Sequence, residues 1–293
     1  MNYFIATIGI PIMSGREHYT KLCLESIIKQ NFDRAFEILL VQHPDYHYKI
    51  KFNIPKNIVI NQIVSGKSLS SKRNDILKHA NGEFILFVDD DIIADENWLF
   101  NMITIAKKND SDIFWGTAKP LYEEEISNNL IPFEMYIGGF HYDSNGILRR
   151  KGLIGCNFGI RKNILHRREK FIESLGRGST IRGGEEVLYL KEYIGDKILF
   201  IDNAVVHHHI QKHRIDFKYI IYNQFNNVIS QVYINKIIGE KNTDLGKDVV
   251  VSLAKSLIPQ KNFVRNFILS IYKLFGYSKG MIKYVLFSGI RIK

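Results

Sequence analysis

Three mostly apolar segments alternate with two segments in which apolar residues recur on one face. The apolar segments cover residues 3–12, 36–43 and 82–91, and the segments between them cover residues 18–30 and 70–80. Short apolar runs rich in β-branched and aromatic residues predict buried strands, and apolar residues spaced three or four apart predict helices. Strands that alternate with helices predict an α/β fold in which helices cover a mostly parallel, Rossmann-like sheet.

The second half of the chain has a less regular pattern. Residues 113–160 contain strand-like pieces around an acidic loop, and residues 196–209 have the pattern of two short strands around a turn at 202–203. Residues 214–239 and 262–286 have the composition and apolar spacing of helices. We therefore expect the sheet to be followed by a helical C-terminal region.

The composition excludes some classes of protein. The chain has 293 residues, of which 45% are hydrophobic, which is enough to form a core. It has only two cysteines, so it is not a disulfide-stabilised secreted scaffold and fits a reducing compartment. The N-terminal sequence lacks the pattern of a signal peptide, and no run approaches the ~20 apolar residues that span a bilayer. We expect a cytoplasmic protein that is free or peripheral on the inner face of the cell membrane.

The C-terminal tail carries most of the net charge of +10. No acidic residue follows Asp248, whereas eight basic residues do: Lys255, Lys261, Arg265, Lys273, Lys279, Lys283, Arg291 and Lys293. A basic excess is typical of proteins that meet nucleic acid, anionic lipid or phosphorylated substrates. Its restriction to one end of the chain indicates a separate role for the tail.

The last predicted helix of the tail has an apolar stripe and basic residues towards another face. The stripe consists of Phe263, Phe267, Ile271, Leu274, Tyr277, Met281 and Val285. Basic amphipathic helices commonly lie in a membrane interface, which makes an anionic membrane surface an expected partner. In the alternative, the stripe packs on the catalytic part of the protein.

Three consecutive carboxylates, Asp89, Asp90 and Asp91, directly follow the third apolar segment. Open α/β sheets bind their ligands at the carboxyl ends of the strands, where these side chains would lie. Adjacent carboxylates repel one another unless a cation offsets them, and oxygen ligands suit Mg²⁺ or Mn²⁺. Such a cation stabilises a diphosphate leaving group. The alternative is an acidic turn that precedes the next helix.

Residues 66–91 resemble the donor-binding segment of family-2 glycosyltransferases. In that family a loop of glycine and serine leads to an arginine–asparagine pair on a helix, and a strand that ends in D-x-D follows. Arg73 and Asn74 match the pair, and Asp89 and Asp91 match the ends of the D-x-D motif. Two further matches follow in the same order as in the family, in the sequences RGGEEVLYLKEYIG and NAVVHHH.

The resemblance covers residues 3–210 and implies a GT-A fold. It implies a catalytic domain over residues 1–210, with a nucleotide-sugar-binding half at 1–115 and an acceptor-binding half at 116–210. Residues 211–293 then form a helical, basic C-terminal extension.

The same resemblance implies an inverting glycosyltransferase. The enzyme would move a sugar from a nucleoside-diphosphate sugar, with UDP as the expected nucleotide, to a saccharide or lipid-linked acceptor in the synthesis of cell-surface polysaccharide or glycolipid. A sugar hydroxyl is a poor nucleophile at neutral pH, so a base must act on it. Glu186 has the base position of the family's G-E-D-like motif. Glu185 is the alternative, because two glutamates in a row make the register ambiguous.

The resemblance also implies a set of metal ligands for Mg²⁺ or Mn²⁺. Asp91 and Asp89 come from the D-x-D motif, and His208 has the family's spacing from the alanine that precedes it. Strand alternation places His207 and His209 together on the opposite face.

The residues that we expect to bind the nucleotide sugar are Pro11, Asp45, Arg73, Asn74, Asp89, Asp90 and Gly184. The guanidinium fork of Arg73 suits phosphate oxygens, although the residue could also be a surface charge on its helix. Gly183 and Gly184 would let the backbone approach a sugar closely. The second strand departs from the family, because VQHPDYH stands where an aspartate-rich sequence usually contacts the base. Asp45 or Gln42 would take that contact.

Other functions fit the sequence less well. A nucleotidyltransferase would have a glycine-rich phosphate loop near the first strand, where this chain has only Gly9 and Gly15. A catalytically inactive sugar-binding protein of the same fold would not need to retain both acidic motifs. A nucleic-acid-binding protein is suggested by the charge, but no nucleic-acid motif is present, so we expect no nucleic-acid partner.

Overall fold

The computed structural model describes residues 4–137, 155–166, 170–191, 197–256 and 263–286. Within this part of the chain, eight strands form one sheet in the order β3-β2-β1-β4-β7-β6-β8-β5. Their bounds are Ala6–Pro11 for β1, Phe36–Gln42 for β2, Ile58–Val64 for β3, Phe84–Val88 for β4, Ile92–Ala94 for β5, Ile113–Tyr122 for β6, Asn157–Arg161 for β7 and Ile198–Ile210 for β8.

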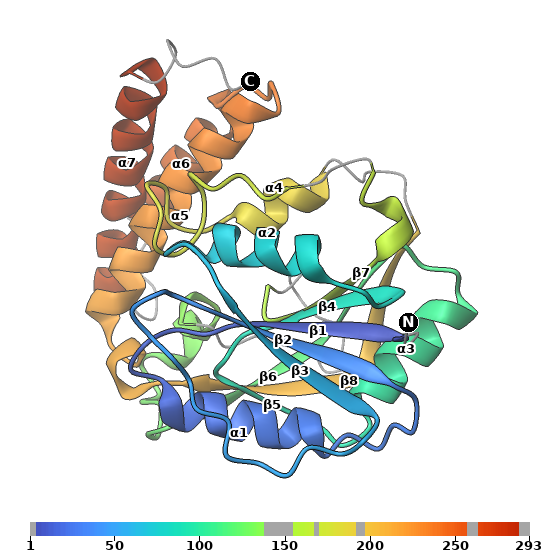
Figure 1. The fold of residues 1–293 in the computed structure, drawn as a ribbon. Helices are drawn as coiled ribbons and strands as arrows, with labels where there is room; N and C mark the ends of the chain where they lie inside the picture. The colour runs from blue at the N-terminus through green and yellow to red at the C-terminus, as the bar shows by residue number, and fades with distance from the viewer. Residues whose placement is uncertain (1–3, 138–154, 167–169, 192–196, 257–262, 287–293) are drawn as a thin grey trace.

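Helices cover both faces of this sheet. They are α1 (Glu17–Ile28), α2 (Leu69–His79), α3 (Trp98–Lys108), α4 (Glu185–Lys191), α5 (Phe217–Ile237), α6 (Thr243–Ser256) and α7 (Phe263–Leu286). Side chains of α1 and α3 share one hydrophobic cluster with the sheet, and those of α2 and α4 share another on the opposite face. The long helices α5, α6 and α7 stand together beyond one end of the sheet (Figure 1).

The topology brings the acidic strand end to the middle of the sheet. β1, β2, β3 and β4 pair in parallel, and β7 joins the edge of β4 in the antiparallel direction. Every residue of β4 is buried. Asp89–Asp91 therefore leave the sheet at the carboxyl end of a central strand, where open α/β sheets bind ligands.

The architecture confirms the predicted α/β fold with a mostly parallel sheet and a helical C-terminal region. Among the strands and α-helices, three were not predicted: the half-exposed edge strand β3, the three-residue strand β5 and the helix α6. The expectation of two short strands around 202–203 was wrong, because β8 is one strand. Its pairing with β6 instead shifts register between Gly116 and Thr117, which leaves an irregularity at the expected turn.

The tail packs on the rest of the molecule. α7 lies along α5 and also contacts α6. A β-carbon added at Gly276 would lie 2.7 Å from the carbonyl oxygen of Phe225, and one at Gly280 would lie 3.0 Å from Cβ of Val232. These glycines therefore permit the close approach of the two helices. The predicted apolar stripe is half-buried on this inner side over Phe267–Tyr277, as the packing alternative proposed.

Three of the basic residues in the tail contact aromatic rings of the molecule itself. Arg265 lies over Phe217, Lys273 over Tyr136 and Lys279 over Phe225, at 5.3 to 5.9 Å from the ring centroids. Among the described helices, none combines the length and the apolar character that crossing a membrane requires.

The helix contact at Gly276 gives a prediction about stability. Glycine to alanine normally stabilises a helix interior by about 1 kcal/mol, but here the new methyl group would meet backbone. We expect Gly276→Ala to lower the free energy of unfolding by about 1–3 kcal/mol, as overpacking does. Thermal melting would measure it against Ser278→Ala, an exposed position on the same helix, which should melt at or above the wild-type temperature. An unchanged or higher melting temperature for Gly276→Ala would show that the two helices do not approach this closely.

Candidate active site

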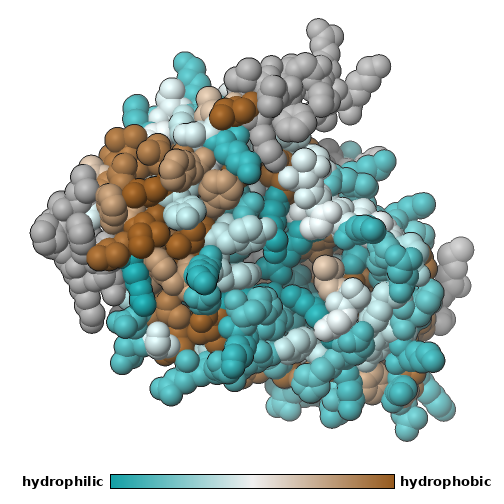
Figure 2. Space-filling view, turned by 90° about the vertical axis from the view of Figure 1, so that its left-hand side faces the viewer, coloured by the Kyte–Doolittle hydropathy of each residue, from teal (hydrophilic) through white to brown (hydrophobic). Residues whose placement is uncertain are grey.

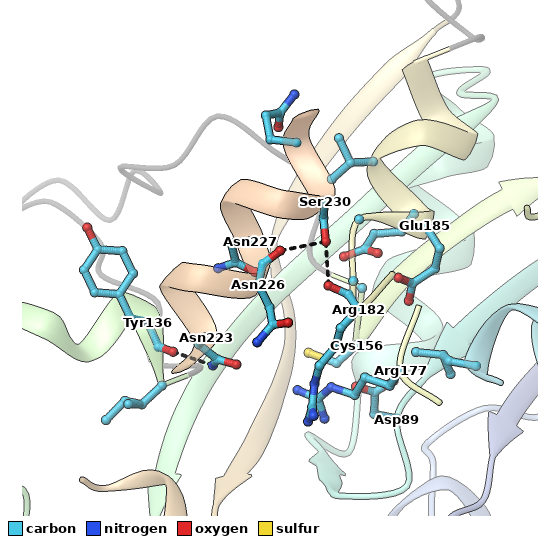
Figure 3. A pocket seen from close by; sticks show the side chains of 18 of the residues that line it. Asp89, Tyr136, Cys156, Arg177, Arg182, Glu185, Asn223, Asn226, Asn227 and Ser230 are labelled. Atoms are coloured by element: carbon cyan, nitrogen blue, oxygen red, sulfur yellow. Dashed lines mark hydrogen bonds between the residues drawn. The ribbon is translucent and has the colours of Figure 1, made fainter. Parts of the chain in front are cut away.

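A cleft of about 330 Å³ opens at the carboxyl end of β4. Asp89 and Cys156 lie on its floor, the loop before α4 and the first turn of α4 form one wall, and α5 forms the facing wall (Figure 3). The same cleft is thus lined by residues from the acidic strand end, from the GGEE sequence and from the C-terminal region.

Arg73 connects the walls of this cleft. Its guanidinium is buried and forms an ion pair at 2.9 Å with Glu185, while Nη2 donates a hydrogen bond to the carbonyl oxygen of Gly155. Nη2 also lies 3.8 Å from Asp89. The rings of Phe158 and Phe171 lie within 5.7 Å of the guanidinium carbon. The alternative of a surface charge is therefore wrong, and the residue is an internal cation that lines the cleft.

The two glutamates of the GGEE sequence occupy different environments. Glu185 is buried, and burial together with the neighbouring Glu186 raises the pKa of its carboxyl to about 7, against the opposing effect of Arg73. Glu186 has 22% of its side chain exposed and lies 3.9 Å from Arg73. Both line the cleft, and Glu186 is the more open to it.

The two glycines that precede the glutamates allow this loop to pack closely against α5. Gly183 and Gly184 have φ angles of +88° and +83°, in the left-handed region that favours glycine. A β-carbon at Gly184 would lie 2.6 Å from Cδ1 of Ile234, so its close neighbour in the structure is α5. Ser230 of the same helix donates a hydrogen bond of 2.6 Å to the carbonyl oxygen of Arg182. The helix α5 therefore sets the position of the glutamate pair.

Asp90 points away from the cleft and holds the loop that follows β1. It accepts hydrogen bonds from the backbone N–H of Met13 at 2.7 Å and from Arg16 at 2.9 Å. Lys72 donates to the carbonyl oxygen of Ile12 in the same loop. Burial raises the pKa of Asp90 to about 6 although Arg16 opposes the shift.

Asp91 is surrounded by positive and hydrogen-donating groups. Its Oδ2 receives Arg16 at 2.9 Å, Gln211 at 3.1 Å and Arg214 at 3.3 Å. Its Oδ1 lies 3.4 Å from Nε2 of His208 and accepts no hydrogen bond from the described residues. Burial alone would raise the pKa of Asp91, but His208, Arg16 and Arg214 hold it well below its usual range.

Asp89, Asp91 and His208 offer ligand atoms that all lie within 4.8 Å of one another. Carboxylate oxygens with one imidazole nitrogen form a donor set that suits Mn²⁺ or Mg²⁺. The buried Oδ1 of Asp91, which lacks a hydrogen-bond donor, fits a bound cation. The other two histidines have different neighbours: His207 pairs with Asp95 at 2.9 Å, and the ring of His209 packs against that of Tyr19.

Three other predicted residues lie outside the residues that line the cleft. Asn74 bonds to the backbone of Phe171 with both ends of its amide, so it anchors the chain there. Asp45 has 85% of its side chain exposed and lies 3.3 Å from His43. Pro11 ends β1 and leads into the loop that Asp90 holds.

Several residues of the site were missed by the sequence analysis. They are Arg16, Arg177, Arg182, Gln211, Arg214 and the polar residues of α5 that line the cleft. Arg177 and Arg182 precede the GGEE sequence and Arg214 follows the histidines by a few positions, so their nearness to the motifs was the available signal. Nothing in the apolar spacing of α5 indicated which of its faces meets the cleft.

Comparisons with known proteins agree with this geometry. The family described as Glycosyl transferase family 2 matches residues 7–169. A curated relative, poly(ribitol-phosphate) beta-glucosyltransferase from Bacillus spizizenii (strain ATCC 23059 / NRRL B-14472 / W23), is 30% identical over 122 residues. That match covers 39% of this chain and only 19% of the relative.

Solved structures share the fold at low sequence identity. TarS 1-349 of S. aureus in complex with UDP-GlcNAc aligns over 96% of this chain and 91% of its own, with a TM-score of 0.50 and 16% identity. The mannosyltransferase PcManGT from Pyrobaculum calidifontis, in complex with GDP-Man and Mn²⁺, aligns over 99% of this chain and 77% of its own, with a TM-score of 0.51 and 10% identity. The fold is thus GT-A. Because the family model matches more than half of the chain, the chain belongs to glycosyltransferase family 2.

Proposed function

We propose that the protein transfers a sugar from a nucleoside-diphosphate sugar, with UDP as the nucleotide, to a hydroxyl of a saccharide or lipid-linked acceptor, with inversion at the anomeric carbon. The observation that carries the proposal is the buried Arg73, which pairs with Glu185 at 2.9 Å and lies 3.8 Å from Asp89. It brings a candidate base and a candidate cation site to one cleft. The curated relative and the UDP-GlcNAc complex of TarS support a cell-surface polysaccharide as product and UDP as nucleotide.

On the donor side, Asp89, Asp91 and His208 would hold Mg²⁺ or Mn²⁺. When bound, the cation supplies positive charge for the diphosphate leaving group. Arg73 and Arg177 line the same cleft and offer guanidinium donors to phosphate oxygens. The Mn²⁺ in the PcManGT complex supports a divalent cation in this role.

The nucleotide would lie along the loop after β1. Pro11 and Asp90 would contribute to nucleotide binding by shaping this loop. Asp90 fixes the loop by accepting a hydrogen bond from the backbone N–H of Met13. We leave Asp45 and Asn74 out of the assignment, because Asp45 is exposed beside His43 and the amide of Asn74 is used by Phe171.

On the acceptor side, Glu186 acts as the general base. Its carboxylate takes the proton of the acceptor hydroxyl while that oxygen forms a bond to the anomeric carbon and the bond to the diphosphate breaks on the opposite side. Gly184, which precedes the glutamate pair, lines the same cleft and lies against Ile234 of α5. Glu185 is a positioning residue, since its ion pair with Arg73 fixes the first turn of α4. Because α5 also lines the cleft, we extend the proposed catalytic unit beyond the end of β8 through Ile237.

We place the reaction at the inner face of the cell membrane. Six exposed apolar residues form an outer apolar set on α6 and α7, consisting of Val250, Val251, Val264, Tyr272, Phe275 and Ile282. Apolar side chains gather over these C-terminal helices in Figure 2. The tail adds basic residues and no acidic residue after Asp248, which suits an anionic lipid surface.

Donor binding should depend on a divalent cation. We expect UDP-glucose, titrated calorimetrically, to bind in the presence of Mn²⁺ and to lose at least about tenfold in affinity with EDTA, because phosphates meet the acidic strand end without compensation. Asp89→Asn should bind weakly in both conditions. Asp33→Asn, which changes an exposed carboxylate far from Asp89 in the sequence, should behave like the wild type. Equal affinity with and without EDTA would remove the cation from the mechanism.

Loss of the base should separate binding from turnover. We expect Glu186→Gln to bind UDP-glucose almost as the wild type does and to turn over ~100-fold more slowly or worse. Glu185→Gln should keep more activity, because an amide can still accept a hydrogen bond from Arg73. If Glu185→Gln is the inactive variant and Glu186→Gln is active, the base is Glu185 and the assignment is off by one residue.

Membrane attachment should depend on the outer apolar set. We expect the wild type to sediment with phosphatidylglycerol-containing vesicles at low salt and less at high salt, because salt screens its basic residues. Phe275→Glu with Ile282→Glu should weaken this binding at least about tenfold, since two inserted side chains are lost. Phe100→Glu, at an exposed apolar site on α3, should bind like the wild type. A wild type that stays off the vesicles ends the membrane proposal.

A further inference from the structure

One face of α5 presents a row of amide side chains to the cleft. The row consists of Asn223, Asn226, Asn227 and Gln231, and Ser230 lies among them. Asn226 and Asn227 follow Asn223 by three and four positions, and Gln231 follows Asn227 by four, so these side chains share one side of the helix. Figure 3 shows Asn223 and Asn226 on the side of α5 that faces Arg182 and Arg177. A helix whose polar residues face a cleft rather than open solvent is available to recognise a ligand.

The amides keep hydrogen-bonding capacity for a ligand. Three of them donate to protein oxygens: Asn223 to the carbonyl of Tyr136, Asn226 to that of Tyr222 and Gln231 to Oδ1 of Asn235. Their own side-chain oxygens accept no hydrogen bond from the described residues. The side chain of Asn227 has no partner at either end within the described part of the chain, and it is exposed to the cleft.

This chemistry matches hydroxyl groups. An amide offers a donor and an acceptor side by side, and a hydroxyl is itself both donor and acceptor. Residues 217–237 contain no acidic residue, so this wall does not repel a phosphorylated chain. Arg182 adds a positive charge beside the row, where its guanidinium donates to the hydroxyl of Tyr222 at 2.9 Å.

The row also has a fixed position relative to the glutamate pair. Ser230 bonds to the carbonyl oxygen of Arg182, and Ile234 packs on Gly184, so α5 and the loop before α4 are joined directly. Asn223 and Gln231 are eight residues apart, which is ~12 Å along a helix. This length exceeds one sugar ring, so the row can hold more than one unit of a chain.

We propose that the amide row of α5 is the acceptor subsite, and that it binds the hydroxyl groups of at least two consecutive units of a sugar or sugar-alcohol chain beside Glu186. The inference rests on the proposed function, because it takes Glu186 as the base that faces the acceptor. It assigns recognition of the acceptor to a helix outside the sheet.

Kinetics with two substrates test the assignment. UDP-glucose serves as donor and a short ribitol-phosphate oligomer as acceptor, and hydrolysis of UDP-glucose without acceptor is measured in parallel. We expect Asn227→Ala and Gln231→Ala each to raise KM for the oligomer about fivefold, the effect of one lost hydrogen bond. Donor hydrolysis should stay as in the wild type in both variants. The melting temperature should stay unchanged in Asn227→Ala, whose side chain has no partner in the described part of the chain, and fall slightly in Gln231→Ala, which removes the donor to the buried Oδ1 of Asn235.

Asn61→Ala is the matched control, since it removes an exposed amide from the edge strand β3. It should leave KM for the oligomer unchanged. Unchanged KM values in both α5 variants would overturn the acceptor subsite. So would a wild type that hydrolyses UDP-glucose but neither glycosylates the oligomer nor binds it in saturation-transfer NMR. A wild type that does not bind UDP-glucose at all would instead contradict the proposed function, and the subsite with it.

Discussion

The buried guanidinium of Arg73 is the charge on which the site depends. A buried cation is tolerated only when carboxylates and hydrogen-bond acceptors surround it. Arg73 finds them in Glu185, Asp89 and the carbonyl oxygen of Gly155, which come from three separate stretches of the chain. The pairing therefore forces α2, the end of β4 and the start of α4 to meet. The candidate active-site cleft thus lies where these three stretches meet around one internal charge.

A second group of cations balances the acidic strand end. Asp90 and Asp91 are both almost fully buried, yet the pKa of Asp90 is raised and that of Asp91 is strongly lowered. The difference follows from their partners, because His208, Arg16 and Arg214 surround Asp91 whereas Asp90 mainly meets Arg16 and one backbone N–H. The two adjacent carboxylates therefore differ: Asp90 holds a loop, and Oδ1 of Asp91 accepts no hydrogen bond from the described residues.

The sheet and the acidic motifs were predictable because local sequence determines them. Apolar runs rich in β-branched and aromatic residues, such as the one that ends at Val88, favour buried strands, and Asp89–Asp91 directly follow that strand. The choice of His208 among three histidines came from the spacing of the resembled family, and the structure brings this side chain close to Asp89 and Asp91. By contrast, β3 is half-exposed and mixed in polarity, so its pattern resembles a loop. The roles of Arg16, Arg177 and α5 arise from tertiary contacts between distant segments, which periodicity within one segment cannot reveal.

The two faces of α5 have different neighbours, so substitutions on one face need not disturb the other. Its far side is packed against α7 through Gly276 and Gly280, while its near side presents amides to the cleft. Exchanges among the amides alter surface chemistry without disturbing the interhelical packing or the charged centre at Arg73. On the proposed assignment, selection can therefore retune the choice of acceptor through a few tolerated substitutions on one helix, while the residues proposed to handle the activated sugar are inherited unchanged.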